Sequence, residues 1–454
     1  MENIKVDVCI IGAGSGGLSV AAGAAQMGAS VVLLEAHEMG GDCLNFGCVP
    51  SKALLSAGAS GVAFDAGKDH VRSVIDAIAP HDSQERFEGL GVRVIREYGR
   101  FIDAKTVEAG SHRITARRFV VATGSGPVVP PIPGIETVTA HTNETIFELR
   151  DKPEHLIIIG GGPIGMEMAQ AHRRFGCDVT VVEGAKALGR DDPDAAAIVV
   201  QTLRDQGVTI LEDTKVEAIS ADNGVTVKTS GGDIVGTHLL VAAGRKVNID
   251  KLNLEAAGVD HDKRGVKVDD GLRSVSNRKV YAIGDAAGGM QFTHLAGYHA
   301  GVIVRSMLFG LPAKAKTNHI PRVTYTSPEL AQIGLTEAEA KVEHGDAVSV
   351  HRVEFAGNDR GLAMSDTVGF TKIMVVKGRP VGVTMVGSGA GELIAMWAMA
   401  MANNLKLSAI SNTVLPYPTR SEINKRAASA YFTPKLFESP TVKRVVGLVQ
   451  RWIP

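Results

Sequence analysis

The chain has few aromatic residues and few cysteines, and it has almost no net charge. Aromatic residues make up 5% of its 454 residues, and the net charge at pH 7 is −1. A nearly neutral chain gives no electrostatic argument for nucleic-acid binding. Four cysteines in so long a chain do not form the disulfide framework of a secreted protein. Glycine, by contrast, is plentiful at 52 residues, which is typical of an α/β enzyme with tight phosphate-binding turns.

One uncharged run, from Val8 to Leu34, is long enough to cross a membrane. It contains Gly12, Gly14, Gly16 and Gly17, and the acidic Glu35 follows it. No flank rich in Lys and Arg and no cleavage site of small residues frames it. A strand, a glycine turn, a helix and a second strand explain all of these features. We therefore expect a cytoplasmic protein with no targeting peptide and no integral membrane segment.

Two of the four cysteines, Cys43 and Cys48, lie close together just beyond that run. In a regular helix their Cα atoms would be about 8 Å apart, whereas a disulfide requires roughly 7 Å or less. A bridge therefore requires a distorted turn or a helix start, and Gly47 and Pro50 suit these. A thiol near a helix N-terminus has a lowered pKa, which makes it a better nucleophile. We interpret the pair as redox-active; the alternatives are two buried structural cysteines or half of a metal site.

The other two cysteines argue against a metal site. Cys9 and Cys177 lie in apolar, strand-like surroundings. No second close pair and no His-x-x-His motif accompanies them, so zinc is not expected and we predict no metal ligand.

Two segments carry the fingerprint of a dinucleotide-binding fold. The first consists of the strand 6–11, a glycine turn, a helix to about Met27 and the strand 31–34; its glycines are Gly12, Gly14 and Gly17, and Glu35 follows. The second has strands at 156–159 and 179–182, with Gly160, Gly162 and Gly165 between them and Glu183 at the end. Such glycines let backbone amides approach a pyrophosphate at a helix N-terminus, and the acid accepts hydrogen bonds from ribose hydroxyls. Two dinucleotide sites and a dithiol suggest an electron relay; the alternative is that one copy binds nothing.

Glu183 also bears on the choice of nicotinamide cofactor. A carboxylate at this place accepts from a 2′-hydroxyl and repels a 2′-phosphate. Gly184 and Ala185 follow it rather than two arginines, although Lys186 and Arg190 are near. The sequence favours NADH, and NADPH stays possible.

Several segments resemble, in the right order, the class I pyridine nucleotide–disulfide oxidoreductases, which include dihydrolipoyl dehydrogenase, glutathione reductase and the core of mercuric reductase. The stretch 40–52 is close to the family's G-G-T-C-x-N-x-G-C-x-P-S-K, with Asp42 in place of threonine. The other matching segments are 121–124, 241–248, 280–285 and 325–329. The resemblance runs from about residue 4 to residue 435.

The resemblance implies an α/β fold with two Rossmann-like dinucleotide-binding domains, for FAD and NAD(P), and a C-terminal α+β dimerisation domain. The implied boundaries are 1–148 for the first part of the FAD-binding domain, 149–270 for the NAD(P)-binding domain, 271–318 for the second part of the FAD-binding domain and 319–454 for the dimerisation domain. The resemblance also implies a homodimer in which each active site borrows Tyr417 and Glu422 from the partner subunit.

The same resemblance implies roles for individual residues. Cys48 is the thiol nearer the flavin, and Cys43 meets the substrate. Lys52 and Glu167 match an ion pair near the flavin, where a cation stabilises negative charge on the reduced ring. Asp285 matches the residue that binds the ribityl chain of FAD. The remaining implied cofactor-binding residues are Gly41, Asp42, Thr123, Gly124 and Gly244.

One departure from the family bears on the substrate. Where the family has His-Pro-Thr-x-x-Glu, this chain has Tyr417 followed by Pro418, Thr419, Arg420, Ser421 and Glu422. Tyrosine has a reference pKa near 10 and is a poor general base at neutral pH, which argues against efficient dihydrolipoamide oxidation. Mercuric reductases resemble the chain in having tyrosine here, but they carry a C-terminal cysteine pair that residues 433–454 lack. His294 and His299 are alternative candidates for the missing base.

We therefore predict an FAD enzyme that exchanges electrons between a nicotinamide cofactor and a small-molecule or protein-bound disulfide or dithiol. The best match is a dihydrolipoyl-dehydrogenase-like activity; the alternatives are a mercuric-reductase-like enzyme and a reductase of a low-molecular-weight disulfide. A further alternative, of another class, is a redox-sensing binding protein that responds to NADH. The tail 441–452 has valines at helical spacing among basic residues, which suggests a membrane-surface helix. Packing against the subunit, or fraying at the terminus, is the interpretation that the sequence favours.

Overall fold

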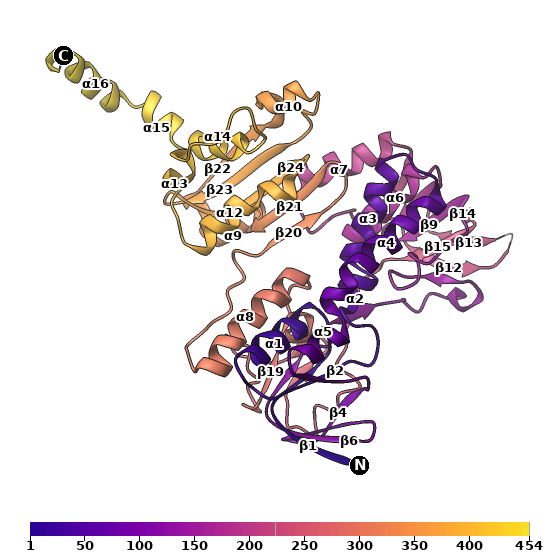
Figure 1. Ribbon diagram of the computed structural model, residues 1–454. Coiled ribbons are helices and arrows are strands. Elements are labelled where there is room, and N and C mark those ends of the chain that lie inside the picture. Colours follow the sequence, from indigo (N-terminus) through magenta and orange to yellow (C-terminus); the bar gives the residue numbers. More distant parts are fainter. Residues whose placement is uncertain (223, 454) are drawn as a thin grey trace. The chain divides into compact units, whose positions relative to one another are not determined.

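The computed structural model of the chain describes residues 1–222 and 224–453 and divides into two units (Figure 1). The first unit comprises Met1–Gly161, Met168–Gly184 and Thr214–Lys316. The second comprises Gly162–Glu167, Ala185–Asp213 and Thr317–Pro454. None of the described helices combines the length and the apolar character that a membrane crossing requires.

The first unit is built on a largely parallel sheet in the order β3-β2-β1-β6-β5-β4, with β19 paired to β6. Its strands are β1 (Glu2–Ile11), β2 (Val31–Leu34), β3 (Val92–Ile95), β4 (Gly99–Asp103), β5 (Thr106–Ala109), β6 (His112–Val121) and β19 (Val280–Ala282). All four residues of β2 are buried, because a parallel sheet is covered on both faces. Since β19 follows β6 by more than a hundred residues, the chain leaves this sheet and later returns to it.

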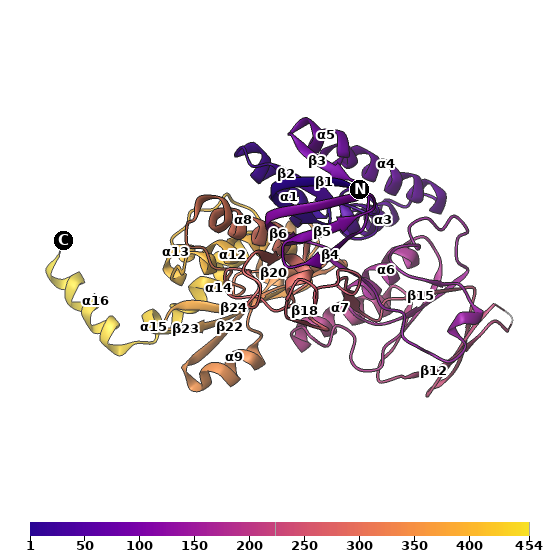
Figure 2. The same ribbon diagram turned by 90° about the horizontal axis from the view of Figure 1, so that it is seen from below.

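Helices α1 (Ser15–Gln26) and α8 (Thr293–Phe309) lie side by side on one face of this sheet (Figures 1 and 2). They bury small and branched side chains against β1 and β2, among them Leu18, Val20 and Ile303. The alanine-rich sequence of α1 allows this close approach of helix and sheet. The position of α8 matters for function because its first residue, Thr293, faces the cysteine pair.

The cysteine segment forms two short helices separated by a turn. These are α2 (Gly41–Asn45) and α3 (Cys48–Ala59), followed by α4 (Phe64–Asp82) and α5 (Gln84–Gly89). A Cβ atom on Gly47 would lie 3.0 Å from the Asp42 carbonyl oxygen and 3.2 Å from the Cys43 Cα, so glycine permits the tight turn. Cys48 is the first residue of α3, so the pair lies at a helix start, one of the two geometries that a bridge requires.

A second parallel sheet in this unit contains β10, β9, β15 and β8 in that order. The strands are β8 (Ala140–His141), β9 (His155–Ile159), β10 (Asp178–Val182) and β15 (His238–Val241), and α6 (Pro163–Arg174) follows β9. An antiparallel sheet of β12 (Val216–Ser220), β13 (Val225–Thr229) and β14 (Gly232–Gly236) packs beside it through Ile219 and Val227. The smaller elements are β7 (Ser125–Pro127), η1 (Ile135–Thr137), β16 (Arg245–Val247), β17 (His261–Asp262), β18 (Gly265–Val266) and η2 (Gly284–Ala287).

The second unit is an antiparallel sheet in the order β20-β21-β24-β23-β22 with helices packed on it. Its strands are β20 (Pro321–Thr324), β21 (Glu329–Gly334), β22 (Val348–Glu354), β23 (Phe370–Val376) and β24 (Arg379–Gly387). The helices packed in its core include α11 (Ala390–Leu393), α12 (Ala395–Ala402), α13 (Leu407–Ser411) and α14 (Glu422–Ala430). Trp397, fully buried at their centre, donates its indole N–H to Asn424 Oδ1 at 2.7 Å.

The second unit contains further elements before and between these strands and at the end of the chain. They are α7 (Pro193–Asp205), β11 (Val208–Leu211), α9 (Glu337–His344), η3 (Gly345–Ala347), η4 (Phe355–Gly357), α10 (Asp359–Ala363), α15 (Thr433–Phe437) and α16 (Pro440–Trp452). Packing of the tail against its own subunit is not what the structure shows, because α16, described in full, has no buried residue.

The predicted fold class, two Rossmann-like α/β folds followed by an α+β domain, is confirmed. The division of the chain at residues 148, 270 and 318 stays a prediction.

Candidate active site

Cys43 and Cys48 come together across the turn between α2 and α3. Both are thiols; Cys43 is half-buried and Cys48 is exposed. The hydrogen bond to Cys48 and burial together raise the pKa of the Cys43 thiol. The sequence led us to expect a lowered pKa from a helix N-terminus; the direction is opposite because the bond between the two sulfurs and burial outweigh that effect. Thr293 Oγ1 lies 3.6 Å from Cys48 Sγ, so the first turn of α8 also contacts the pair.

The glycine turn of the first fingerprint has the close approaches that a bound pyrophosphate requires. Gly12 has φ +107°, and a Cβ atom there would lie 2.4 Å from the Ala122 carbonyl oxygen. A Cβ atom on Gly17 would lie 1.9 Å from the Gly12 carbonyl oxygen. Gly14 caps α1 without any side-chain hydrogen bond, and a Cβ atom there would meet nothing within 4 Å. Gly14 therefore leaves room beside the start of α1, where a phosphate group would bind.

Glu35 and Glu183 make the same contact in the two fingerprints. The Glu35 carboxylate accepts hydrogen bonds from the backbone N–H of Ala13 at 2.7 Å and of His37 at 2.8 Å. The Glu183 carboxylate accepts from the backbone N–H of Gly161 at 2.7 Å. Each acid thus ties the end of its strand to the glycine turn, with lone pairs left for ribose hydroxyls.

The glycines of the second fingerprint, and Gly244 in a later turn, have their own backbone geometry. Gly160 has φ +112°, and a Cβ atom there would lie 2.5 Å from the Ala242 carbonyl oxygen. Gly162 comes directly before α6, and Gly165 is buried in its first turn. Gly244 has φ +135°, and a Cβ atom there would meet nothing within 4 Å.

A polar network joins the predicted FAD-binding acids, Asp42 and Asp285. Ser125 donates its hydroxyl to Asp285 Oδ2 at 2.6 Å. The Arg245 guanidinium donates to Ser125 Oγ at 2.8 Å and lies 3.0 Å from Asp42 Oδ2. Asn143 donates to Asp42 Oδ1 at 3.0 Å. Burial raises the pKa of Asp285, while Ser125 and Arg245 oppose the shift.

Three of the predicted FAD-binding residues lie at the edges of this network. Gly41 has φ +64° and lets α2 approach the glycine turn of the first fingerprint closely. A Cβ atom on Gly41 would lie 2.8 Å from the Gly14 Cα. Thr123 Oγ1 is buried and has no hydrogen-bond partner among the described residues. Gly124 has φ +63° with open space beside it. A buried hydroxyl that lacks a partner and a cradle that only glycine permits fit a bound FAD.

Lys52 and Glu167 belong to different units, so their ion pair stays a prediction. Lys52, on α3, donates to the Ser51 hydroxyl at 3.2 Å. Glu167, on α6, is buried and accepts from the backbone N–H of Tyr325 at 2.9 Å.

The Tyr417 hydroxyl is oriented by Asp359 rather than by Glu422. It donates to Asp359 Oδ2 at 3.0 Å, although the tyrosine is 70% exposed. The hydrogen bond to Asp359 raises the pKa of Tyr417. Glu422 Oε2 is buried and has no hydrogen-bond partner within the described residues.

His299 is a structural residue and not the missing base. Its Nδ1 accepts a hydrogen bond from the backbone N–H of Gly284 at 3.2 Å. Burial lowers its pKa to about 4. His294, the other candidate, stacks on Phe292 with ring centroids 5.3 Å apart.

Sequence reasoning missed several residues of this site: Ser125, Asn143, Arg245, Thr293 and Asp359. They lie far along the chain from the residues that they contact, and only the Gly244–Arg245 turn carried a motif.

Comparison with known proteins agrees with this geometry. The family model described as "Pyridine nucleotide-disulphide oxidoreductase" matches residues 6–300, and that of the family's dimerisation domain matches residues 320–428. A mercuric reductase of Lysinibacillus sphaericus is 33% identical over 95% of this chain and 84% of its own length. A dihydrolipoyl dehydrogenase of Staphylococcus aureus is 32% identical over 94% of this chain and 96% of its own. Among solved structures, the Cu(II) complex of the HOCl-induced flavoprotein disulfide reductase RclA from Escherichia coli superimposes with a TM-score of 0.87 at 30% identity, covering 93% of this chain and 99% of that one.

Proposed function

We propose a substrate class for this chain, which belongs to the pyridine nucleotide-disulphide oxidoreductase family, a family that binds FAD and uses NAD(P)H. The substrate is a disulfide or dithiol, and the activity is of the dihydrolipoyl dehydrogenase type. The observation that carries this proposal is the hydrogen-bonded pair of Cys43 and Cys48 next to a glycine cradle that fits FAD. Two sulfurs in contact can hold or release two electrons as one disulfide.

Bound FAD supplies the two-electron step between NAD(P)H and the cysteine pair. The Cys43 sulfur attacks one sulfur of the substrate disulfide while its proton passes to the departing sulfur, so a mixed disulfide forms and the first substrate thiol leaves. Cys48 then attacks the Cys43 sulfur, which releases the second thiol and leaves a Cys43–Cys48 disulfide. NAD(P)H and one proton restore the dithiol, so the sum is one disulfide and NAD(P)H plus a proton converted to two thiols and NAD(P)⁺.

Charged side chains of the chain support this cycle. Lys52 would stabilise negative charge on the reduced cofactor. Asp285 and Asp42, held by Ser125 and Arg245, bind cofactor hydroxyls. Glu183 favours NADH, because its carboxylate repels a 2′-phosphate.

The subunit arrangement is also part of the proposal. The match to the dimerisation domain supports a homodimer. Each active site then receives Tyr417 and Glu422 of the other subunit, and the buried Glu422 oxygen that lacks a partner supports an environment completed there. By analogy with the family, the proposal includes a cytoplasmic location.

The neutral Tyr417 phenol favours the reductive direction. Its hydrogen bond to Asp359 keeps it protonated. Once the hydroxyl turns away from Asp359, its one proton can go to a leaving thiolate, whereas a protonated phenol does not remove a proton from a dithiol. The same residue supports a second candidate, reduction of a thiol-binding metal ion such as Hg²⁺ or Cu²⁺. The likeness to mercuric reductases and to a disulfide reductase solved with Cu(II) supports that candidate.

An anaerobic titration of the FAD-loaded protein with NADH tests the proposal. A long-wavelength thiolate-to-flavin absorbance band at two electrons is expected, and it should be absent from Cys48→Ser. Direct bleaching without that band in the wild-type protein would mean that the cysteines are bystanders. A steady-state panel of lipoamide, glutathione disulfide and Hg²⁺ then separates the two candidates. Cys43→Ser should lose turnover with every disulfide while it keeps electron transfer from NADH to a dye.

A further inference from the structure

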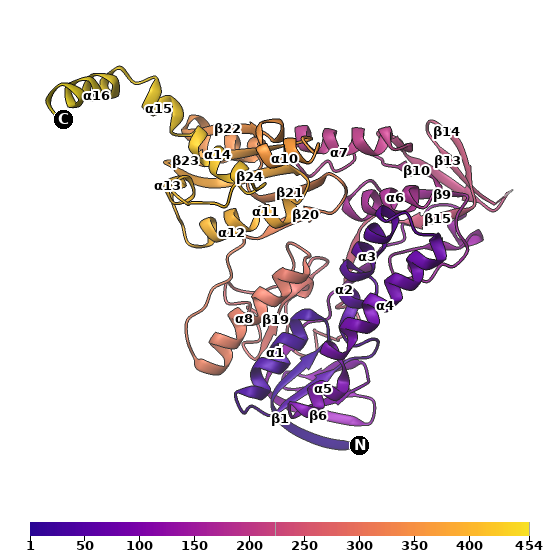
Figure 3. The ribbon, with the colours of Figure 1, turned by 45° about the horizontal axis from the view of Figure 1, so that its top comes forward.

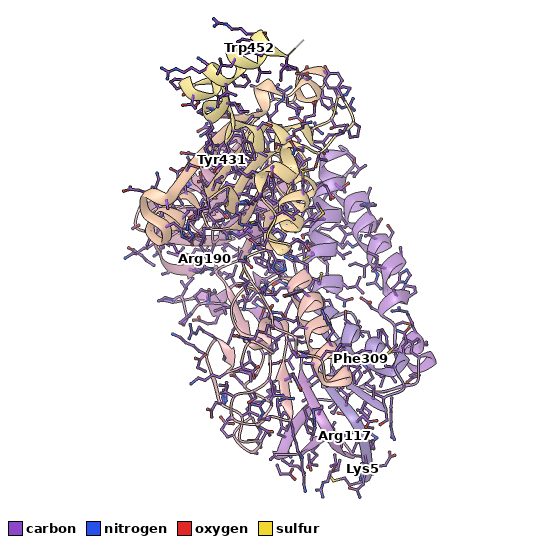
Figure 4. The ribbon with its side chains drawn as sticks, turned by 90° about the vertical axis from the view of Figure 1, so that its left-hand side faces the viewer. Lys5, Arg117, Arg190, Phe309, Tyr431 and Trp452 are labelled. Carbon is purple, nitrogen blue, oxygen red and sulfur yellow. The ribbon has the colours of Figure 1, made fainter. Side chains whose placement is uncertain are left out.

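The tail beyond α14 carries a helix, α16, in which no residue is buried by the described part of its own chain. The family's dimerisation match ends at residue 428, and Tyr431 and Phe432 are the last side chains that pack against the core of the second unit. Helix α16 then extends away from the sheet of that unit, as Figures 1 and 3 show. Figure 4 labels Trp452 at the outer end of this tail and Tyr431 at its base.

The residues at the start of α16 favour a helix that begins there. The Ser439 hydroxyl accepts from the backbone N–H of Val442 at 3.4 Å, and Pro440 occupies the first turn. Both are favoured helix-start residues. The helix spans 13 residues, about 20 Å at 1.5 Å per residue.

The two sides of α16 differ sharply in chemistry. At about 100° per residue, its large apolar side chains fall on one side of the helix: Val442, Val445, Val446, Leu448, Val449 and Trp452. The opposite side carries the basic residues Lys443, Arg444 and Arg451. The sequence from residue 439 to residue 453 contains no acidic residue. The apolar side is exposed, with Leu448 at 55% and Trp452 at 80%.

We propose that α16 docks this enzyme on an anionic membrane surface. The helix would lie in the plane of the membrane interface. Its apolar side, here called the valine stripe, would face the acyl chains, and its three cations would lie near lipid phosphates. Charge complementarity supports this occupant, because α16 carries three cations and no acidic residue. A stripe of valines with its one aromatic residue at the end suits a fluid lipid surface; a protein groove usually takes an aromatic anchor near the centre.

The test is co-sedimentation of the full-length, FAD-loaded protein with vesicles of phosphatidylcholine alone or with 30% phosphatidylglycerol. Binding to the anionic vesicles is expected, and 0.5 M NaCl should weaken it. Replacing Lys443, Arg444 and Arg451 by Gln should lower the partition coefficient about a hundredfold, roughly fivefold per cation. V445Q/V449Q should lower it at least tenfold. G447Q, which puts the same side chain on the polar side, is the matched control and should change it less than twofold.

Three results would overturn the proposal. The first is equal binding, or none, on both kinds of vesicle. The second is a halved sedimentation mass of V445Q/V449Q without lipid, which would assign the stripe to a second copy of the chain. The third is binding to poly-glutamate that V445Q/V449Q leaves intact, with no vesicle binding, which would assign the cations to an acidic protein. All variants should keep disulfide turnover, so this outcome is independent of the proposed function.

Discussion

Replacing Tyr417 by His should create the general base that this site lacks. In the wild-type protein the phenol donates to Asp359 Oδ2 at 3.0 Å, and that contact raises its pKa. From a reference pKa near 10, at most about one tyrosine in a thousand is ionised at pH 7, and the contact lowers this share further. Because so little of the basic form exists, a substrate dithiol finds no proton acceptor here.

The size of the gain follows from the populations of the basic forms. A histidine with a pKa near 6.5 is neutral in about three of four molecules at pH 7. The basic form therefore increases roughly a thousandfold, and general-base catalysis contributes about 10²–10⁴ in rate. Asp359 would favour the imidazolium, which reduces the gain at neutral pH. We expect dihydrolipoamide oxidation to rise about a hundredfold at pH 8, which corresponds to about 2.7 kcal/mol of barrier.

The assay is NAD⁺ reduction by dihydrolipoamide from pH 6 to pH 9. In Tyr417→His, kcat/KM should rise with pH through a new pKa near 7, which a merely structural change would not produce. Tyr417→Phe is the matched control and should not show this titration. A change of less than threefold in Tyr417→His, with FAD bound and NADH-to-dye transfer intact, would refute the view that this residue limits dithiol oxidation.

Three further predictions concern the cofactor, stability and pH. The wild-type enzyme should prefer NADH in dye reduction, and Glu183→Ala should raise KM for NADH about tenfold while KM for NADPH changes little; a wild-type preference for NADPH would contradict this. Lys372→Met should destabilise the second unit by about 3–5 kcal/mol in chemical denaturation, because Asp192, 1% exposed, loses its cation. Lys341→Met, which breaks an ion pair with Glu337 in which the lysine is 60% exposed, is its control and should cost about 0–1 kcal/mol. Burial lowers the pKa of His172 to about 3, so between pH 7 and pH 5 the unfolded chain binds a proton that the folded chain does not. The free energy of unfolding should therefore fall by about 2 kcal/mol over this range. In His172→Gln the denaturation midpoint should no longer show this fall.

Local patterns allowed the dinucleotide folds to be predicted with little error. The predicted strand 31–34 is β2, and the helix predicted to end near Met27 is α1, which ends at Gln26. These elements were predictable because each signal lies within a few residues. The signals are a buried apolar run, a turn whose φ of +107° requires glycine, and an acid that reaches back to that turn. The turn between Cys43 and Cys48 was predictable for the same reason.

The residues that orient the site were not predictable, because they depend on contacts across long sequence separations. Ser125 meets Asp285 from 160 residues away, and Tyr417 meets Asp359 from 58 residues away. Ser125 and Asp359 have no local pattern that distinguishes them from any other serine or aspartate. The raised pKa of Cys43 has a similar origin, since it depends on burial and on a neighbouring thiol.

This division between local and long-range signals explains why the family is evident and the substrate is not. The parts that bind cofactors must satisfy steric rules of the backbone, which fix glycine at particular positions and so leave a trace in the sequence. The parts that face the substrate work through side-chain hydrogen bonds such as Tyr417 to Asp359, which many pairs of residues can supply. The identity of the disulfide therefore depends on groups that the fold brings together. The pH profile of kcat/KM in Tyr417→His measures the contribution of one of those groups.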